Sequence, residues 1–460
     1  MSYNRACHLP TADCQCSLVN CQLLIINSQL LIINCQLSIV ISMIRQTIMN
    51  LRQNPFLSTI SIAGTAFAIT MIMAIVITWQ TKYADFAPEV NRSRSLYVMA
   101  MHIYNQDNQD EHSYGFTSPA FLKECVLPLK GIEAATAFGG ISGALVSLAD
   151  GSNRLKVDKK ITDAGFWKVF KPRFLAGHGF SEEEVQSVVV CASVARKLFG
   201  TTEVVGQQLL YNRETMRIAG VVEDVSVAAK DAYAQIWVPY TPGMLQANGV
   251  WSYFGGMQIA IVAKSTDDFP AIRDELSRRV EAVNAGLGNR KIDIMEQPDN
   301  IVAHVNHVWC NIGPDLTMLY LQYAVALLII LLVPSLNLCG LSSSRMQQRM
   351  AELGVRKAFG GTRWVLVRQI LNENLLLTLL GGVAGLLLSY LSVYLMREWL
   401  FTGSGNVGTS GEFSLSMDVL FSPWIFLLAF AFCVVINLMS AALPAWLAAK
   451  RPIVESLNDK

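Results

Sequence analysis

The stretch FLSTISIAGTAFAITMIMAIVITW, residues 56–79, contains no acidic or basic side chain. A helix needs roughly 20 apolar residues to cross the hydrocarbon core of a bilayer. Because no water is available there to pair with backbone groups, a helix is the structure that such a stretch adopts. We therefore predict a transmembrane helix at residues 56–79.

The composition of the whole chain agrees with a membrane protein. Of its 460 residues, 52% are hydrophobic and 15% are charged, whereas soluble domains carry roughly 25% charged residues. The mean hydropathy is +0.37. The formal net charge of +1 argues against nucleic acid as the main partner, because a nucleic-acid-binding surface needs a positive field.

Three further apolar runs, at residues 316–341, 375–396 and 420–449, are also long enough to cross a bilayer. The block 80–315 has an ordinary polar composition and separates the first run from the second. The expected fold class is therefore a membrane protein with four transmembrane α-helices. One of them precedes a large extracytoplasmic domain and three follow it.

Basic residues near the ends of the spans indicate the orientation of the chain, because they mark the cytoplasmic side. Arg45 and Arg52 precede the first span, and Lys450 and Arg451 follow the fourth. The loop between the second and third spans carries six basic residues: Arg345, Arg349, Arg356, Lys357, Arg363 and Arg368. We therefore expect a protein of the cell (inner) membrane with both termini in the cytoplasm and the large domain outside.

The outer block is predicted to be an α+β domain of one or two parts. Alternating or short apolar runs rich in β-branched and aromatic residues predict strands at residues 94–103, 187–193, 216–225 and 235–240. Helical spacing is found at residues 118–129 and 267–287, and Ser118 and Pro119 form a plausible cap and first turn.

Cysteine and histidine residues in the outer block are candidate metal ligands. Cys125, Cys191 and Cys310 lie far apart, which predicts buried or free thiols with at most one bridge. In HVNHVWC, His304, His307 and Cys310 recur every three residues, which would suit a membrane-anchored metal-dependent enzyme. Steps of three drift around a helix, and no carboxylate completes a motif such as H-E-x-x-H, so we expect no metal site.

The most informative short segment is RMQQRMAELGVRKAFGGTRWVLVRQILNENLLL, residues 345–377. Apolar residues near helical spacing, with basic residues between them, predict a short amphipathic helix along the membrane surface. Gly360 and Gly361 predict a break before the chain re-enters the bilayer. Charge alone is also explained by topology and by acidic lipid headgroups.

The order of the residues goes beyond charge. ELGVRKAFGGTRWVLVRQIL resembles the cytoplasmic signature of FtsX-type permeases, the MacB-like ABC transporter membrane subunits, whose pattern is close to E-x-G-x-R-K-A-x-G. The residues in those places are Glu352, Gly354, Arg356, Lys357, Ala358 and Gly360. The resemblance continues in SVVVCASVARKLFG in the outer block and ALPAWLAAKRPIVESL near the end. His178 and Val205 depart from the Arg and Ile that are usual in the family.

The resemblance implies a transporter subunit that is not itself an enzyme. The chain has no G-x-x-x-x-G-K-[ST] phosphate loop, and in this family ATP is bound by a partner ATPase, so we expect no cofactor in this chain. The six signature residues would receive the motion of the ATPase and pass it to the outer domain. The expected function is export or extraction of a substrate from the outer side. The alternative is an FtsX-like signalling permease that activates an outer partner.

The family also implies a dimer, either a homodimer or a heterodimer with a similar permease. A periplasmic adaptor and membrane lipid are further expected partners. In the third span, Gly381, Gly385 and Ser389 form a ladder of small residues that lets two helices approach closely. This ladder fits a dimer seam and packing within one subunit equally well.

The first residues of the chain have a different character. VNCQLLIINSQLLIINCQLSIVIS, residues 19–42, repeats one phrase every seven residues. It lacks the charged positions of a coiled coil, and an odd step would move its side chains to opposite faces of a strand. A tandem DNA repeat explains it better, so we expect the functional protein to start at Met43 or Met49.

These observations divide the chain into nine segments. They are a repetitive extension (1–42), a cytoplasmic start with the first span (43–79), the extracytoplasmic domain (80–315), the second span (316–341), the cytoplasmic coupling segment (342–374), the third span (375–396), an outer loop (397–419), the fourth span (420–449) and a cytoplasmic tail (450–460).

Overall fold

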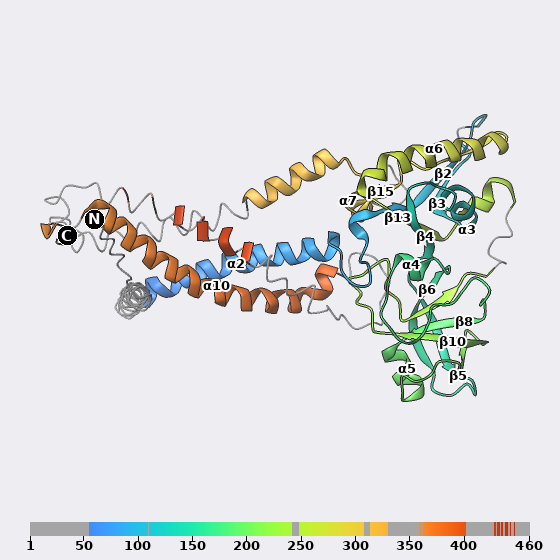
Figure 1. Cartoon of the computed structure of the whole chain (residues 1–460), viewed down its shortest axis with the longest axis horizontal. Helices are drawn as coiled ribbons and strands as arrows, with labels where there is room; N and C mark the ends of the chain where they lie inside the picture. The colour runs from blue at the N-terminus through green and yellow to red at the C-terminus, as the bar shows by residue number, and fades with distance from the viewer. Residues whose placement is uncertain are drawn as a thin grey trace, which may run out of the picture. The chain divides into compact units, whose positions relative to one another are not determined.

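The computed structural model describes residues 55–401 apart from 109, 242–247, 308–312, 330–354, 356–357 and 361, together with scattered positions between 427 and 446 (Figure 1). The repetitive extension 1–42, the two candidate start residues and the tail 450–460 lie outside the described residues. So do most of the outer loop 397–419 and most of the fourth predicted span.

The chain forms two compact units. We call them the helical unit, Met1–Thr70 with Leu331–Leu388 and Ala429–Lys460, and the sheet unit, Met71–Ile330 with Ser389–Leu428. Helix α2 (Pro55–Tyr83) contributes its first half to the helical unit and its second half to the sheet unit. Helix α10 (Arg363–Phe401) is divided in the same way after Leu388.

Two described helices are long and apolar enough to cross a membrane, Ile62–Tyr83 within α2 and Ile370–Met396 within α10. They coincide with the first and third predicted spans. A shorter apolar helix, Leu316–Ile329, covers the first half of the second predicted span. The described positions of the fourth predicted span are helical, and the full count of four spans stays a prediction.

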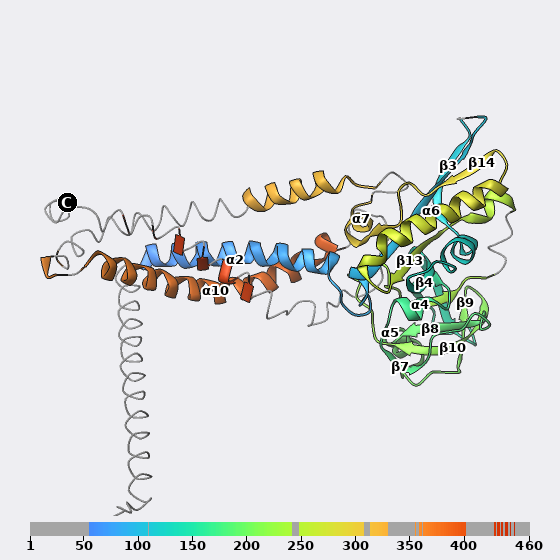
Figure 2. The same cartoon turned by 45° about the horizontal axis from the view of Figure 1, so that its top comes forward.

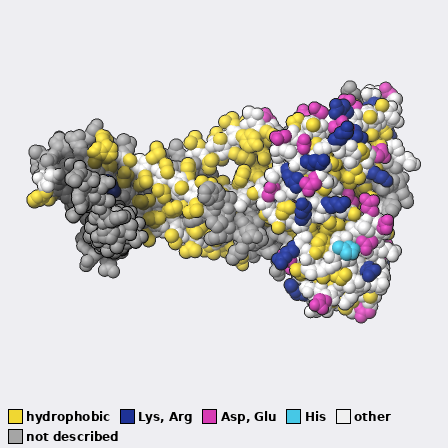
Figure 3. Space-filling model, in the orientation of Figure 1, with side chains coloured by type: hydrophobic (Ala, Val, Ile, Leu, Met, Phe, Trp, Pro, Cys, Tyr) yellow, Lys and Arg dark blue, Asp and Glu magenta, His cyan; other side chains and the backbone are white. Residues whose placement is uncertain are grey.

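The surface of these helices suits lipid. Along α10, Leu387 and Leu395 are among many large apolar side chains that are more than half exposed. Figure 3 shows hydrophobic side chains covering the described helices, whereas lysine, arginine and acidic side chains gather over the sheet unit. Within α2, the hydroxyl groups of Thr70, Thr78 and Thr81 each donate to the carbonyl oxygen four residues earlier. Polar side chains in an apolar helix are satisfied locally in this way.

The sheet unit contains one mixed sheet of fifteen strands. The main path is β11-β8-β10-β9-β5-β6-β4-β13-β3-β2-β14. The strands are β1 (Ser95–Val98), β2 (Ala100–Asn105), β3 (His112–Thr117), β4 (Ile132–Gly139), β5 (Ser142–Leu148), β6 (Leu155–Thr162), β7 (Phe174–Gly177), β8 (Ser187–Cys191), β9 (Gln208–Tyr211), β10 (Glu214–Val222), β11 (Ile236–Pro239), β12 (Phe254–Gly255), β13 (Met257–Ala263), β14 (Arg290–Asp293) and β15 (Asp299–Asn300). All four predicted strand regions are confirmed. In Figure 2, β3 and β14 project from the rest of the sheet as a narrow ribbon.

Five helices lie along the sheet among the described residues. They are α3 (Pro119–Phe121), α4 (Phe166–Val169), α5 (Ala192–Phe199), α6 (Phe269–Gly286) and α7 (Ile301–Asn306). The predicted cap is present, because the Ser118 side chain accepts from the amides of Ala120 and Phe121 and Pro119 follows. The helix expected at residues 118–129 is divided, since a π-helical turn at Leu122–Val126 follows α3. It stops before Pro128, which has no N–H to continue it.

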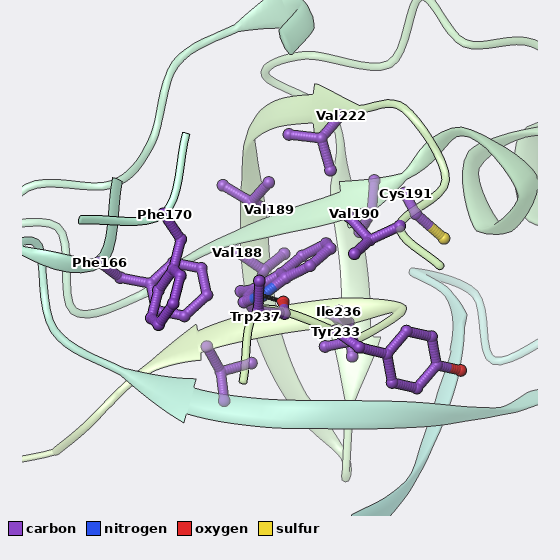
Figure 4. Close-up of a cluster of buried hydrophobic side chains, with 14 of the residues drawn as sticks. Phe166, Phe170, Val188, Val189, Val190, Cys191, Val222, Tyr233, Ile236 and Trp237 are labelled. Atoms are coloured by element: carbon purple, nitrogen blue, oxygen red, sulfur yellow. Dashed lines mark hydrogen bonds between the residues drawn. The ribbon is translucent and has the colours of Figure 1, made fainter. Parts of the chain in front are cut away.

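Two hydrophobic cores stabilise the sheet unit. The first surrounds β8, whose five residues are all buried. Figure 4 shows Trp237 packed among Val188, Val189 and Phe166 in this core. The second lies under α6, which buries Ile272, Leu276 and Val280 at steps of four. Each such side chain contributes about 1.5–3 kcal/mol when it leaves water. The outer block is an α+β domain with two separate hydrophobic cores.

Candidate functional site

The described residues of the predicted coupling segment fall into two parts: residues 355 and 358–360 stand at the end of a helix, and residues 363–374 begin α10. Of the six signature residues, Ala358 and Gly360 are described, and Glu352, Gly354, Arg356 and Lys357 lie outside the described residues. The Phe359 amide donates to the Val355 carbonyl at 3.1 Å, a helical hydrogen bond. Gly360 then has φ +88° and nothing within 4 Å of the place where a Cβ would stand. Glycine is therefore favoured here by its backbone conformation and not by crowding.

Large apolar side chains are exposed around this helix end. Phe359 is 88% exposed and Trp364 is 71% exposed, and Val355 and Val365 are also exposed. We call these four residues the coupling surface. The prediction from sequence stressed charges and glycines and missed Phe359, which occupies a variable position of the family pattern. Exposed aromatic side chains on a polar segment of the chain are typical of a surface that another molecule covers.

One contact joins the coupling surface to the end of the chain. The rings of Trp364 and Trp446 lie 5.5 Å apart between centroids, with an interplanar angle of 63°. Such aromatic pairs contribute roughly 0.5–1.5 kcal/mol beyond their buried area. Trp446 belongs to the closing ALPAWLAAKRP segment, so two motifs separated by about 80 residues in the printed sequence meet at the start of α10.

The small residues of α10 make close contact with α2 of the same chain. A Cβ added to Gly381 would lie 2.7 Å from the Thr65 Cβ, and one added to Gly385 would lie 2.7 Å from the Ala66 carbonyl oxygen. The Thr70 hydroxyl, which donates to the Ala66 carbonyl at 2.7 Å, also lies 3.1 Å from the Gly385 carbonyl oxygen. We call these contacts the glycine seam. They represent packing within one subunit. Ser389 is buried as well, and a dimer seam stays a prediction.

The two histidines of the candidate metal motif point to different carboxylates. His304 Nε2 lies 3.0 Å from Asp231 Oδ2, and its ring stacks on Tyr97 at 4.1 Å. His307 Nδ1 lies 2.7 Å from Asp299 Oδ2. No group of three or more metal-binding side chains is found in the part of the chain that the structure describes, and Cys310 lies outside it. These histidines form two separate pairs with aspartate.

Comparison with known proteins follows the same division of the chain. Residues 58–279 match the model of the MacB-like periplasmic core domain, and residues 324–453 match that of the FtsX-like permease C-terminal domain. The chain belongs to the MacB/FtsX family of ABC transporter permeases. The core-domain match runs from α2 into α6, and the FtsX-like match contains the coupling surface and α10.

The relatives of this permease include longer proteins. The macrolide export ATP-binding/permease protein MacB of Bdellovibrio bacteriovorus is 26% identical over 291 residues, which cover 61% of this chain and 41% of that protein. The uncharacterised ABC transporter permease YknZ of Bacillus subtilis is 23% identical, over 65% of this chain and 74% of that protein. The crystal structure of an extracellular YknZ domain aligns with a TM-score of 0.29 and 14% identity, over 42% of this chain and 99% of that domain. The permease thus spans about two fifths of the MacB protein.

Two cysteines of the outer block, Cys125 and Cys191, lie among the described residues. Cys125 and Cys191 are both free and buried, which confirms the prediction for these two. Burial raises the pKa of each thiol to about 12. Because the thiolate is the reactive form, neither cysteine is poised for nucleophilic or redox chemistry.

Proposed function

We propose that this permease couples ATP hydrolysis by a partner ATPase to movement of its extracytoplasmic domain, and that this movement drives export or extraction of a substrate from the outer side of the membrane. Family membership supports this proposal, because the chain joins a permease-type membrane part to an outer core domain. The MacB relative is named as a fused ATP-binding and permease protein. Both models matched here are of permease type, and we propose that ATP is bound by a partner ATPase subunit.

The coupling surface is the observation that carries the proposal. Phe359 and Trp364 expose large rings at a helix end, in the segment whose sequence resembles the ATPase contact of the family. Docking of a partner there would bury both rings. Aromatic side chains of this kind supply most of the energy at protein interfaces.

Helix α10 supplies the route for motion. It is continuous over 39 residues, and it begins three residues after Gly360. A helix of this length moves as a nearly rigid body, so a rotation imposed at its cytoplasmic end is passed along it. The glycine seam lets α2 follow, because Gly381 and Gly385 keep the two backbones in contact.

The test compares two exposed phenylalanines. Phe359→Ala should weaken copurification of the partner ATPase with the permease and reduce any stimulation of its ATP hydrolysis. Phe67→Ala is the matched control, because Phe67 is 62% exposed on α2, away from the coupling surface in sequence. Equal ATPase binding by both variants would overturn the proposed docking site. The proposal extends to a homodimer or heterodimer, which crosslinking in membranes would detect.

A further inference from the structure

The sheet unit holds the outer end of α2 by a closed ring of three hydrogen bonds. Asn306 Nδ2 donates to the Tyr83 hydroxyl at 2.9 Å, and the Tyr83 and Tyr323 hydroxyls lie 3.0 Å apart. The Tyr323 hydroxyl donates to Asn306 Oδ1 at 3.0 Å. With Tyr83 as the donor to Tyr323, each hydroxyl gives one hydrogen bond and accepts one. We call this cycle of hydrogen bonds among Tyr83, Asn306 and Tyr323 the tyrosine ring. The ring therefore ties the last residue of α2 to the last residue of α7 and to the apolar helix Leu316–Ile329.

A buried ion pair holds the same end of α2 from another side. Glu89 and Arg92 are 2% and 4% exposed, and Arg92 Nε donates to Glu89. The Arg92 guanidinium also donates to the carbonyl oxygens of Thr81, at 2.7 Å, and Ala84, at 3.3 Å. The last carbonyls of a helix lack partners and carry partial negative charge. Arg92 thus caps the C-terminal end of α2.

The ion pair connects this helix end to the loop between β10 and β11. Arg92 donates to the Ala228 carbonyl at 3.4 Å. Glu89 Oε1 accepts from the amides of Asp231, at 3.0 Å, and Ala232, at 2.8 Å. The loop is itself fixed to the sheet, because the buried Lys160 of β6 donates to the Asp231 carbonyl at 2.7 Å. Residues about 140 positions apart in the chain are thereby joined.

The same loop reaches the segment that leads to the next apolar helix. The Asp231 carboxylate pairs with His304 of α7, two residues before Asn306 of the ring. A path of polar bonds therefore runs from α2 through Arg92, Glu89 and Asp231 to His304 of α7. The tyrosine ring joins α7 directly to the end of α2 and so completes a loop of bonds. Packed apolar side chains of similar volume would stabilise such a junction as well or better than a buried ion pair. What the polar groups add is a fixed geometry.

We propose that the tyrosine ring and the Glu89–Arg92 pair form a transmission joint. Tyr83, Asn306, Tyr323, Glu89 and Arg92 act as its positioning residues. They hold the outer end of α2 and the entry to the following apolar helix against the sheet, so that a displacement of these helices becomes a displacement of the extracytoplasmic domain. This inference deepens the proposed function and rests on it for its role in transport.

The first experiment needs neither ATP nor a partner. Spin labels on cysteines introduced at the exposed Lys82 and Lys130 report the distance between the end of α2 and the sheet in the full chain in nanodiscs. We expect a single narrow distance distribution in the parent protein. The combined variant Tyr83→Phe, Tyr323→Phe, Glu89→Leu and Arg92→Met should broaden it. An unchanged distribution in that variant would overturn the joint.

Matched controls separate the joint from general damage. Tyr320→Phe removes a hydroxyl one turn before Tyr323, and Arg173→Gln with Glu223→Gln removes an ion pair whose side chains are 77% and 48% exposed. Both controls should leave the distribution narrow. Should the combined variant fail to fold, the double variant Tyr83→Phe with Tyr323→Phe takes its place, because it removes two hydroxyl groups and keeps both aromatic groups. An unchanged distance distribution in this double variant would count against the joint.

The second experiment adds the partner ATPase. A fluorophore at Lys130 and acceptors on lipid headgroups report movement of the domain relative to the membrane. The joint predicts that the combined variant loses the ATP-dependent change in energy transfer while the ATPase still binds and turns over. A full change in that variant would overturn the joint. No change in the parent protein would instead contradict the proposed function, and the distance measurement would still decide on the joint.

Discussion

The two halves of α2 are held by opposite means. In the helical unit, the glycine seam brings backbone against backbone, and the Thr70 hydroxyl lies 3.1 Å from the Gly385 carbonyl oxygen across it. In the sheet unit, the end of the same helix is held by the tyrosine ring and by the buried Glu89–Arg92 pair. Inside lipid there is no hydrophobic force to press helices together, so close packing of small residues is the available means. Outside it, directional polar bonds fix position and angle. The glycine seam therefore sets how closely α2 and α10 approach, whereas the polar bonds set the position of the end of α2 against α7 and the loop between β10 and β11.

The largest effect should come from breaking the buried pair on one side. Arg92→Met leaves the Glu89 carboxylate buried without its cation, which costs roughly 3–5 kcal/mol in comparable pairs. The free energy of unfolding, measured by denaturant titration of the full chain in detergent, should fall by this order. Adding Glu89→Leu should restore much of the loss. If Arg92→Met alone is as stable as the parent, the Glu89–Arg92 pair does not hold the end of α2 as we propose.

The next effect concerns Asp163, a buried carboxyl for which no ion pair is found among the described residues. Asp163 is held by the Thr136 hydroxyl and the Ala137 amide, and burial raises its pKa from 3.8 to about 6. The folded state therefore holds this proton more tightly than the unfolded state does. The raised pKa of Asp163 therefore stabilises the folded state below pH 4, and this stabilisation is lost as the pH rises to 6. At 1.36 kcal/mol per pKa unit, the loss is at most about 3 kcal/mol.

The matched variant for this carboxyl is Asp163→Asn, which has no charge to gain. Between pH 4 and 6 the parent should lose stability relative to this variant, and above pH 7 the difference should be constant. Parallel stability curves over the whole range would contradict the raised pKa. Asp231 provides the contrast, because burial would raise its pKa but the charges of His304 and Lys160 outweigh burial and hold it below its usual value.

A smaller effect is expected at the glycine seam. Gly385→Ala places a Cβ 2.7 Å from the Ala66 carbonyl oxygen, and backbone cannot move aside as a flexible side chain can. Overpacking of this kind costs about 1–3 kcal/mol. Gly286→Ala is the control, because nothing lies within 4 Å of its Cβ position. Unfolding of both variants in mixed micelles of rising SDS content measures the difference, and equal midpoints would refute the tight contact.

The smallest effect should follow from Tyr83→Phe. Removing one hydroxyl from the tyrosine ring should lower the free energy of unfolding by roughly 0.5–1.5 kcal/mol, the value of a hydrogen bond. The aromatic group of residue 83 keeps its size. The Tyr320→Phe control should be within error of the parent in the same denaturant titration. A loss shared by both variants would show that the hydroxyl of Tyr83 has no special role.

The sequence predicted what depends on local pattern. Uncharged runs located the helices at residues 56–79 and 375–396, and Ser118 with Pro119 marked a helix start. Gly381 and Gly385 indicated a close contact but not its partner, because spacing on one helix does not say which helix packs against it. The joint could not be predicted at all. Glu89, Asp231 and His304 lie in loops or at a helix end, far apart in sequence, and no periodicity links them. Phe359 was missed because one exposed side chain has no pattern.

Motion received at the coupling surface should reach the outer domain, and energy transfer between a fluorophore at Lys130 and headgroup acceptors can detect this. The measurement is made with and without ATP for the parent permease, Phe359→Ala and Phe67→Ala. We expect an ATP-dependent change in the parent and in Phe67→Ala, and its loss in Phe359→Ala. A full ATP-dependent change in Phe359→Ala, or none in the parent, would refute this coupling.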